Sequence, residues 1–226
     1  MKKINKKNLQ QLSETVAVLT ESEQKRFIGA AFYYSYEGNL LGFMGDSCEV
    51  RVVDAGTFYS LQYCNDDTCL FGSSNSLFYS DEQTQANVIN YMAMELGLSN
   101  IYVGALYDKV GNLLYTSGGR TTHFGTSYTY PDGSVIYDHQ YSYITINNVS
   151  DMFKNGNFYD IMCTLIHEQD HYENYNFYTH ENVASEYYAY NVTIYNEYFE
   201  YASSEFQESI YSQYRYYQNL FYNMYY

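Results

Sequence analysis

The sequence predicts an α+β protein with a separate segment at its N-terminus. Three observations predict it: the net charge changes sign after the first 30 residues, the part that follows reads as strands and turns, and from Phe158 the pattern is helical to the end. We expect residues 1–30 to be a leader and residues 31–226 to be one domain. Within that domain, residues 31–156 would form the strand-rich half and residues 157–226 the helical half.

Branched and aromatic residues predict the early strands of the domain. They lie at Cys48–Asp54 and Thr57–Cys64, and Ser142–Ile146 is a later strand of the same kind. Between them, Ser80-Asp81-Glu82-Gln83 has the capping-box pattern that opens a helix, and Gly97 is a suitable residue to end that helix.

Two turn sequences predict β-hairpins. Asp108–Asn112 would join the strands Ile101–Tyr107 and Leu113–Tyr115, because its polar and glycine residues suit a tight turn. Pro131–Ser134 would form a second turn, with three strand residues on either side.

The composition excludes several classes of protein. With 26 acidic and 11 basic residues the formal net charge is −15, so a nucleic-acid-binding role is disfavoured, and no apolar run approaches the length of a transmembrane segment. The chain has 32 tyrosines and no tryptophan. Either an AT-rich genome favours tyrosine codons, or the tyrosines form an aromatic face that grips a polymer or a partner protein.

Four cysteines, Cys48, Cys64, Cys69 and Cys163, allow three full disulfide pairings, and the sequence does not choose among them. Cys64 and Cys69 flank a turn-like stretch that a disulfide could close. Cys163 lies one helical turn before His167, and we expect it to be a small buried core residue and not a metal ligand.

The first 30 residues differ from the rest in charge and pattern. They hold six basic and three acidic residues, whereas residues 31–226 hold five and 23. Leu9, Leu12, Val16 and Leu19 have helical spacing, and the segment ends in Gly29-Ala30.

This segment resembles the double-glycine leader of bacteriocin-type peptides. The resemblance implies a partner, a peptidase-containing ABC exporter that would cut near Gly29-Ala30 and release a secreted, extracellular protein. The alternative is an ordinary N-terminal helix that stays attached.

The sequence His167-Glu168-Gln169-Asp170-His171 predicts a metal site on a helix. Two histidines four residues apart lie on one helical face and can bind one ion. Zn²⁺ prefers neutral imidazole and carboxylate ligands, and Glu168 would lie beside a water molecule on that ion and take its proton. The alternative is two surface histidines on a polar helix.

A third ligand must come from further along the chain. If the helix ends near Asn176 and the next begins near Glu181, His171 and Glu186 each lie about 7–8 Å from the turn, because a helix rises by 1.5 Å per residue. Glu186 is therefore the expected ligand, with His180 ranked second. The other candidates considered are Glu173, Glu181 and Glu197.

The two histidines, the motif glutamate and a later Ser185-Glu186 with Ala189 make this region resemble the gluzincin branch of HExxH zinc metallopeptidases, although the gap to Glu186 is shorter than usual. The resemblance implies His167, His171 and Glu186 as ligands of Zn²⁺ and Glu168 as general base.

A peptidase also needs a group that stabilises the oxyanion. We expect Tyr190, one turn beyond Glu186, to supply it, and Tyr187, His123 and His139 are alternatives. Asp170 would either support a ligand histidine or be a solvated helix residue.

These features predict a secreted zinc metallopeptidase, specifically an endopeptidase, that hydrolyses protein or peptide substrates. One alternative is a bacteriocin-like antibacterial effector, which the leader suggests. Another is a non-catalytic, zinc-stabilised binding protein that uses its tyrosine-rich surface.

Overall fold

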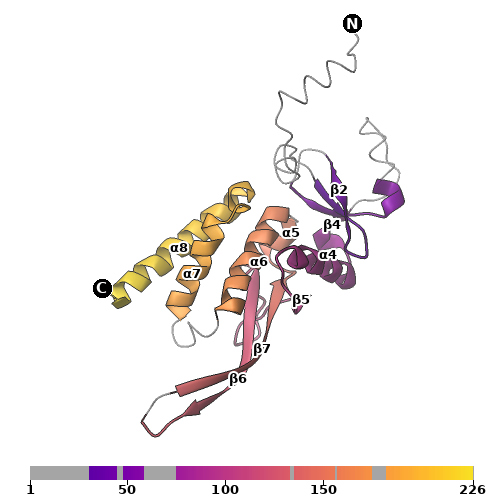
Figure 1. Cartoon of the computed structure of the whole chain (residues 1–226). Helices are drawn as coiled ribbons and strands as arrows, with labels where there is room; N and C mark the ends of the chain where they lie inside the picture. Colours follow the sequence, from indigo (N-terminus) through magenta and orange to yellow (C-terminus); the bar gives the residue numbers. More distant parts are fainter. Residues whose placement is uncertain are drawn as a thin grey trace, which may run out of the picture.

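Two small sheets and a group of helices make up the part of the chain that this computed structural model describes, residues 31–44, 48–58, 75–132, 135–155, 157–174 and 182–225 (Figure 1). The α+β class predicted from the sequence is confirmed. The strands are β1 (Ala31–Tyr34), β2 (Leu40–Met44), β3 (Val50–Val52), β4 (Asn75–Ser76), β5 (Ile101–Gly104), β6 (Gly119–Thr129) and β7 (Val135–Asn147). The helices are α4 (Glu82–Glu95), α5 (Asp151–Asn155), α6 (Phe158–Glu173), α7 (Asn182–Tyr195) and α8 (Ser204–Tyr225), with short 3-10 turns η1 (Leu77–Tyr79) and η2 (Phe199–Tyr201).

The two sheets differ in their order and in the direction of their strands. The first has the order β2-β1-β3-β4, with β1 antiparallel to β2 and parallel to β3. The second has the order β5-β7-β6, with β7 in the centre, parallel to β5 and antiparallel to β6. Within the described residues, β6 is therefore an edge strand with one side open to pairing.

One hydrophobic core joins the sheets to α4 and α6. It contains side chains from β1, β3, β7 and both helices, of which the fully buried ones include Tyr34, Val50, Ile89, Met92, Ile144, Ile146, Ile161, Met162 and Leu165. On α6 the residues Phe158, Ile161, Met162 and Leu165 follow helical spacing, so one face of the helix packs into the core. Each such side chain contributes roughly 1.5–3 kcal/mol through its burial, which fixes the rotation of α6 about its axis.

The three long helices of the C-terminal part lie next to one another (Figure 1). The rings of Tyr187 and Phe221 stack with centroids 4.8 Å apart, and those of Tyr190 and Tyr217 with centroids 5.7 Å apart, so tyrosines form much of the contact between α7 and α8. Asp160, near the start of α6, accepts hydrogen bonds from the backbone and hydroxyl of Ser203, which fixes the beginning of α8 against α6.

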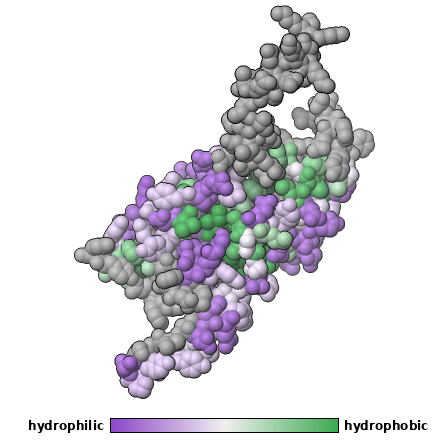
Figure 2. Space-filling model, viewed as in Figure 1, coloured by the Kyte–Doolittle hydropathy of each residue, from purple (hydrophilic) through white to green (hydrophobic). Residues whose placement is uncertain are grey.

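The β6–β7 hairpin projects from the body of the protein (Figure 1). Figure 2 shows hydrophilic residues along this hairpin and hydrophobic residues gathered in the middle of the same face. None of the described helices is both long and apolar enough to cross a membrane.

Several local predictions are correct and others are not. The strands β6 and β7 on either side of the predicted turn at Pro131–Ser134 are antiparallel, as expected, although both are much longer than expected; residues 133 and 134 lie outside the described residues. At Asp108–Asn112 the turn forms, but the flanking residues share only the bridge between Tyr107 and Leu113, because β5 pairs with β7 instead. Ser142–Ile146 is part of β7, as predicted.

The ends of α4 also test the sequence analysis. Its N-cap is Asp81, whose carboxylate accepts hydrogen bonds from the backbone and hydroxyl of Thr84, so Ser80 is not the cap. Gly97 follows the helix with φ +72°, which confirms the predicted stop.

The strand predicted to begin at Thr57 is wrong where it can be tested, because residues 55–58 form a helical turn in which Asp54 accepts from the backbone of Thr57. Residues 59–64 lie outside the described residues.

The predicted leader, with Gly29-Ala30, and two of the cysteines, Cys64 and Cys69, also lie outside the described part. Cys48 and Cys163 carry free thiols. Cys163 is fully buried, so its predicted place in the core is confirmed, and burial raises the pKa of its thiol to about 12.

The turn between β1 and β2 generates the first prediction. Gly38 has φ +88°, and a Cβ there would overlap the backbone carbonyl of Asn87 on α4, whose side chain holds this turn through Tyr36. Gly38→Ala should therefore lower the free energy of unfolding by more than about 2 kcal/mol. Gly97→Ala is the matched control, since Gly97 has a similar φ but open space around it, and should cost about 1 kcal/mol. Equal losses in denaturant unfolding would contradict the packing of this turn on α4.

Candidate metal centre

The first part of the site is set by where α6 begins. Asn157 caps the helix, with its side-chain oxygen accepting from the backbone of Tyr159 and Asp160 at 2.9 and 3.2 Å. The helix then runs without interruption to Glu173, so His167 and His171 lie one turn apart on the same side. Both imidazoles are largely buried, with side-chain exposures of 12% and 14%.

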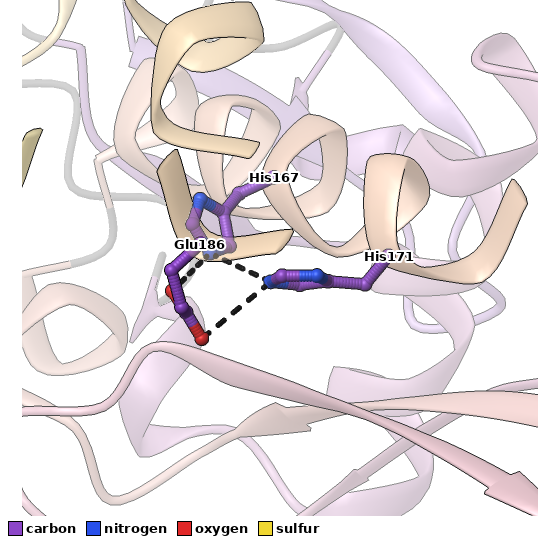
Figure 3. A group of neighbouring side chains, drawn as sticks. All are labelled: His167, His171 and Glu186. Carbon is purple, nitrogen blue, oxygen red and sulfur yellow. Dashed lines mark hydrogen bonds and ion pairs between the residues drawn. The ribbon is translucent and has the colours of Figure 1, made fainter. Parts of the chain in front are cut away.

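Glu186 reaches these histidines from the neighbouring helix α7 (Figure 3). Its Oε2 lies 3.6 Å from His167 Nε2, and its Oε1 lies 3.7 Å from His171 Nε2. The two Nε2 atoms are 3.3 Å apart. The structure thus brings together the three residues that the sequence analysis named as ligands, and these are a group that could hold a metal ion.

The spacing of these atoms suits a small tetrahedral ion. Bonds of about 2.0–2.2 Å at tetrahedral angles place ligand atoms about 3.4 Å apart, and the three separations here are 3.3, 3.6 and 3.7 Å. If both Nε2 atoms of His167 and His171 carry lone pairs, these lone pairs face each other at close range. A cation between them and the Glu186 carboxylate would remove that repulsion.

The charges of the site shift the pKa values of its members. Burial opposes a charge on His167, but the Glu186 carboxylate and the charges of Glu168 and Asp170 outweigh burial and raise its pKa. Burial and the charge of His167 together lower the pKa of His171 to about 4. Burial would raise the pKa of Glu186, but the two imidazoles outweigh it and lower this pKa. The cluster therefore favours an ionised carboxylate beside imidazoles.

Glu168 is buried between α6 and the start of β6. Only 5% of its surface is exposed, and burial raises the pKa of its carboxyl although His167 and Thr121 oppose this. The Thr121 hydroxyl donates to Glu168, with the carboxylate Oε2 at 2.7 Å and the backbone carbonyl oxygen at 2.9 Å sharing its one proton. A Cβ at Gly119 would lie 3.0 Å from Glu168 Cγ, so a glycine lets β6 approach the helix this closely.

Two hydroxyl groups on α7 face the outer nitrogens of the histidines. Ser185 Oγ is 2.7 Å from His171 Nδ1, and Thr193 Oγ1 is 3.4 Å from His167 Nδ1. Each imidazole thus has a polar partner at Nδ1 and directs Nε2 toward Glu186.

Tyr190 lies beside the same group. Its ring centroid is 4.5 Å from that of His167, and its ring also stacks on that of Tyr217 of α8. Burial, and then the charge of Glu186, raise the pKa of its phenol, so the hydroxyl remains a hydrogen-bond donor. Within the described residues this hydroxyl makes no hydrogen bond.

The site opens into a cleft of about 1080 Å³. The three ligand candidates line it together with Glu168 and Tyr190. The first half of β6 forms one wall, the first half of α8 forms another, and the cleft extends along α6 as far as Asp160. A wall formed by an edge strand suits an extended ligand.

The other sequence candidates lie elsewhere or do not contact the ligand group. Glu173 accepts a hydrogen bond from Gln169 on the exposed side of α6, and Glu197 lies beyond the end of α7. His180 and Glu181 lie outside the described residues.

Among the alternatives for the oxyanion, Tyr187 packs between α7 and α8 against Phe221. His139 lies 2.6 Å from the hydroxyl of Ser142 on the hairpin, and His123 shares that hydroxyl at 2.6 Å but also lines the cleft. Of these three, His123 alone is placed to meet a ligand in the cleft.

Asp170 does not support a ligand histidine through a hydrogen bond in the described part of the chain. Its Oδ1 accepts from the side chain of Asn174, the C-cap of α6, and its Oδ2 is buried without a partner there. Its charge reaches His167 only through space.

Sequence reasoning missed the three hydroxyl groups of Thr121, Ser185 and Thr193. Ser185 directly precedes Glu186, and Thr193 follows it by seven residues, two helical turns, so helical spacing from Glu186 could have indicated them. Thr121 comes from a strand 47 residues before Glu168, and no local pattern marks it.

Comparisons with protein-family models, curated proteins and solved structures found no match to this chain. The likeness to zinc peptidases therefore rests on the motif residues and their geometry.

The charge coupling within the site can be tested directly. Because the Glu186 carboxylate helps to hold a proton on His167, Glu186→Gln should lower the pKa of His167 in metal-free protein, as followed by NMR titration. Glu173→Gln removes a carboxylate from the exposed side of α6 and should leave it unchanged. A pKa of His167 that stays the same in Glu186→Gln would show that the two side chains are not paired in solution.

Proposed function

We propose that the chain is a zinc-dependent peptidase with a zincin-like domain in which the HExxH helix follows the strand-rich half. The observation that carries the proposal is the convergence of His167, His171 and Glu186, with ligand atoms 3.3–3.7 Å apart, beside the buried Glu168. Two imidazoles and one carboxylate are the protein ligands of a known class of catalytic zinc sites, which leave a fourth position open.

Zinc bound by these residues would lower the pKa of a water molecule and polarise a substrate carbonyl group. Glu168 is suited to the proton transfers, because its carboxylate is held by Thr121 close to the histidines and its raised pKa brings it nearer to neutrality. Glu168 takes a proton as the water oxygen bonds to the carbonyl carbon. It would then give that proton to the amide nitrogen as the C–N bond breaks. The second proton of the water passes from the new carboxyl group to the amine or to solvent, which leaves a carboxylate.

A polypeptide is the substrate class that the cleft favours. Among the described residues β6 is an edge strand and several of its residues line the cleft, and an extended peptide can pair with an edge strand through backbone hydrogen bonds. The backbone hydrogen bonds would give affinity for many sequences, and the cleft has a volume of about 1080 Å³.

Tyr190 would supply the group that stabilises the oxyanion. Its ring lies against His167, its phenol stays protonated, and its hydroxyl has no other partner among the described residues. A donor of this kind stabilises negative charge on the carbonyl oxygen more in the transition state than in the substrate.

The export leader remains part of the proposal. The positive residues 1–30 precede a strongly acidic remainder, and cleavage near Gly29-Ala30 by a peptidase-containing exporter would release the domain outside the cell. A secreted product whose measured mass corresponds to a chain that still begins at Met1 would contradict the cleavage of the leader and leave the rest of the proposal standing.

Removing the general base is the direct test of the mechanism. Glu168→Gln keeps the size of the side chain but cannot accept the proton, so it should retain one equivalent of zinc and lose at least about 100-fold in kcat on a cleaved peptide. The peptide is first selected by incubating the wild-type protein with a peptide library and identifying cleavage by mass spectrometry.

Glu173→Gln is the matched control for this change, because it alters a carboxylate on the exposed side of the same helix, and it should cleave as the wild type does. Unchanged activity in Glu168→Gln would remove Glu168 from the mechanism. Zinc binding without cleavage of any library peptide would favour a zinc-stabilised binding protein. If the Glu168→Gln protein still kills sensitive bacteria, that result would favour a non-proteolytic antibacterial effector.

The role of Tyr190 gives a separate prediction. Tyr190→Phe should reduce kcat by about 10–1000-fold with a small change in KM, because it removes a donor used mainly in the transition state. Tyr195→Phe, at the exposed end of the same helix, should leave both constants unchanged. A normal kcat in Tyr190→Phe would shift the search to His123.

A further inference from the structure

Helix α7 contacts both histidines at atoms that a metal ion would not use. Ser185, Glu186 and Thr193 face α6 together, and the two hydroxyl groups meet His171 Nδ1 at 2.7 Å and His167 Nδ1 at 3.4 Å. One helix therefore supplies the candidate carboxylate ligand and the outer partners of both imidazoles.

The direction of the Thr193 hydrogen bond follows from its other contact. Its hydroxyl donates to the backbone carbonyl of Ala189 at 2.7 Å, so its single proton is already used. Toward His167 it can only accept, which requires the proton of a neutral imidazole to be on Nδ1. Because Thr193 is fully buried, a water molecule could not readily take the place of its hydroxyl beside His167 Nδ1.

His171 can adopt the same form of the ring. Its Nε2 lies 3.3 Å from that of His167, so at most one of these two nitrogens carries a proton, and a metal ion needs a lone pair on both. A proton on Nδ1 of His171 can be donated to Ser185, which leaves a lone pair on Nε2.

We propose that Ser185 and Thr193 are positioning residues that hold His171 and His167 in the Nδ1-protonated form, so that both Nε2 atoms are ready to bind one metal ion. This inference rests on the proposed zinc site. Metal-ligating histidines commonly donate their other nitrogen to a partner that fixes the ring, and loss of such partners typically costs 10–100-fold in metal affinity. Here the partners are neutral hydroxyl groups, and both come from the helix that carries Glu186.

As a consequence, α7 supplies both the carboxylate ligand and the two hydroxyl groups that contact the histidines of α6. Residues 185 and 186 are adjacent and residue 193 follows two turns later, so they lie along one side of the helix. Any displacement of α7 would disturb the carboxylate and both imidazoles at once. Tyr190, one turn after Glu186, packs on His167 from the same side.

The test is the affinity for Zn²⁺ alone, measured by competition with a chelator. Thr193→Val keeps the shape of the side chain and removes the hydroxyl, and Ser185→Ala removes the other hydroxyl. Each should bind zinc 10–100-fold more weakly than the wild type. Thr193→Ser and Ser185→Thr keep the hydroxyl and should bind within a few-fold of the wild type.

Thr164→Val is the matched control. Thr164 is also a buried threonine on a helix, and its hydroxyl donates to the carbonyl four residues earlier, as that of Thr193 does, but it has no hydrogen bond to a histidine of the described part. It should leave zinc affinity unchanged. Equal affinities in Thr193→Val, Ser185→Ala and the wild type, or an equal loss in Thr164→Val, would overturn the proposal.

A second measurement separates this inference from the zinc site itself. At a pH where both imidazoles are neutral, the ¹⁵N shifts of metal-free protein report which nitrogen carries the proton. The wild type should show Nδ1–H at both His167 and His171, and Thr193→Val should lose this preference at His167. A wild type that binds no zinc but shows these forms would refute the proposed function and leave the positioning role standing. Nε2–H at either histidine would refute the positioning role.

Discussion

Two imidazole nitrogens that face each other at 3.3 Å on a buried helical face are the constraint on which the rest of this structure depends. Unless one Nε2 carries a proton and donates it to the other, the two lone pairs repel each other at this distance. Here one side of α6 is fixed in the core by Ile161 and Leu165, so the other side must present His167 and His171 to whatever covers it. Helix α7 covers this side of α6 and contributes the carboxylate of Glu186.

The burial of so many titratable groups would be costly unless they were paired. Glu186 pairs with both histidines, and Glu168 takes a hydrogen bond from Thr121 while it stays near His167. The two carboxylates are thus treated differently by their surroundings. The pKa of Glu186 is lowered, which suits an ionised metal ligand, whereas the pKa of Glu168 is raised, which suits a group that exchanges protons. The same separation of roles is what a hydrolytic zinc site requires.

Much of the site could be predicted from the sequence because helices impose a regular spacing. The interval between His167 and His171 places them on one face, and equal distances from an expected turn led to Glu186 on the next helix. The residues that support them were harder to predict. Thr121 and Gly119 reach Glu168 through the packing of β6 on α6, a contact between distant segments that no local pattern encodes.

The strands show the same limit. The turn at Pro131–Ser134 was predicted from its residues, but the pairing of β5 with β7 depends on a parallel contact across about 40 residues, and it displaced the expected hairpin at Asp108–Asn112. At the start of α4 the N-cap is one residue later than expected, because the carboxylate of Asp81, and not the hydroxyl of Ser80, accepts the hydrogen bond from the backbone of Thr84. Local sequence preferences therefore predicted the positions of helices and strands better than they predicted which strands pair and which side chains form hydrogen bonds.

The central claim is that His167, His171 and Glu186 hold one zinc ion. Its most direct test is the metal content of purified protein after equilibration with zinc and removal of free metal, measured by mass spectrometry for the wild type and for His167→Ala. The account predicts one equivalent in the wild type and a large loss in the variant. A wild type without stoichiometric zinc, or a variant that retains the same amount, would contradict it.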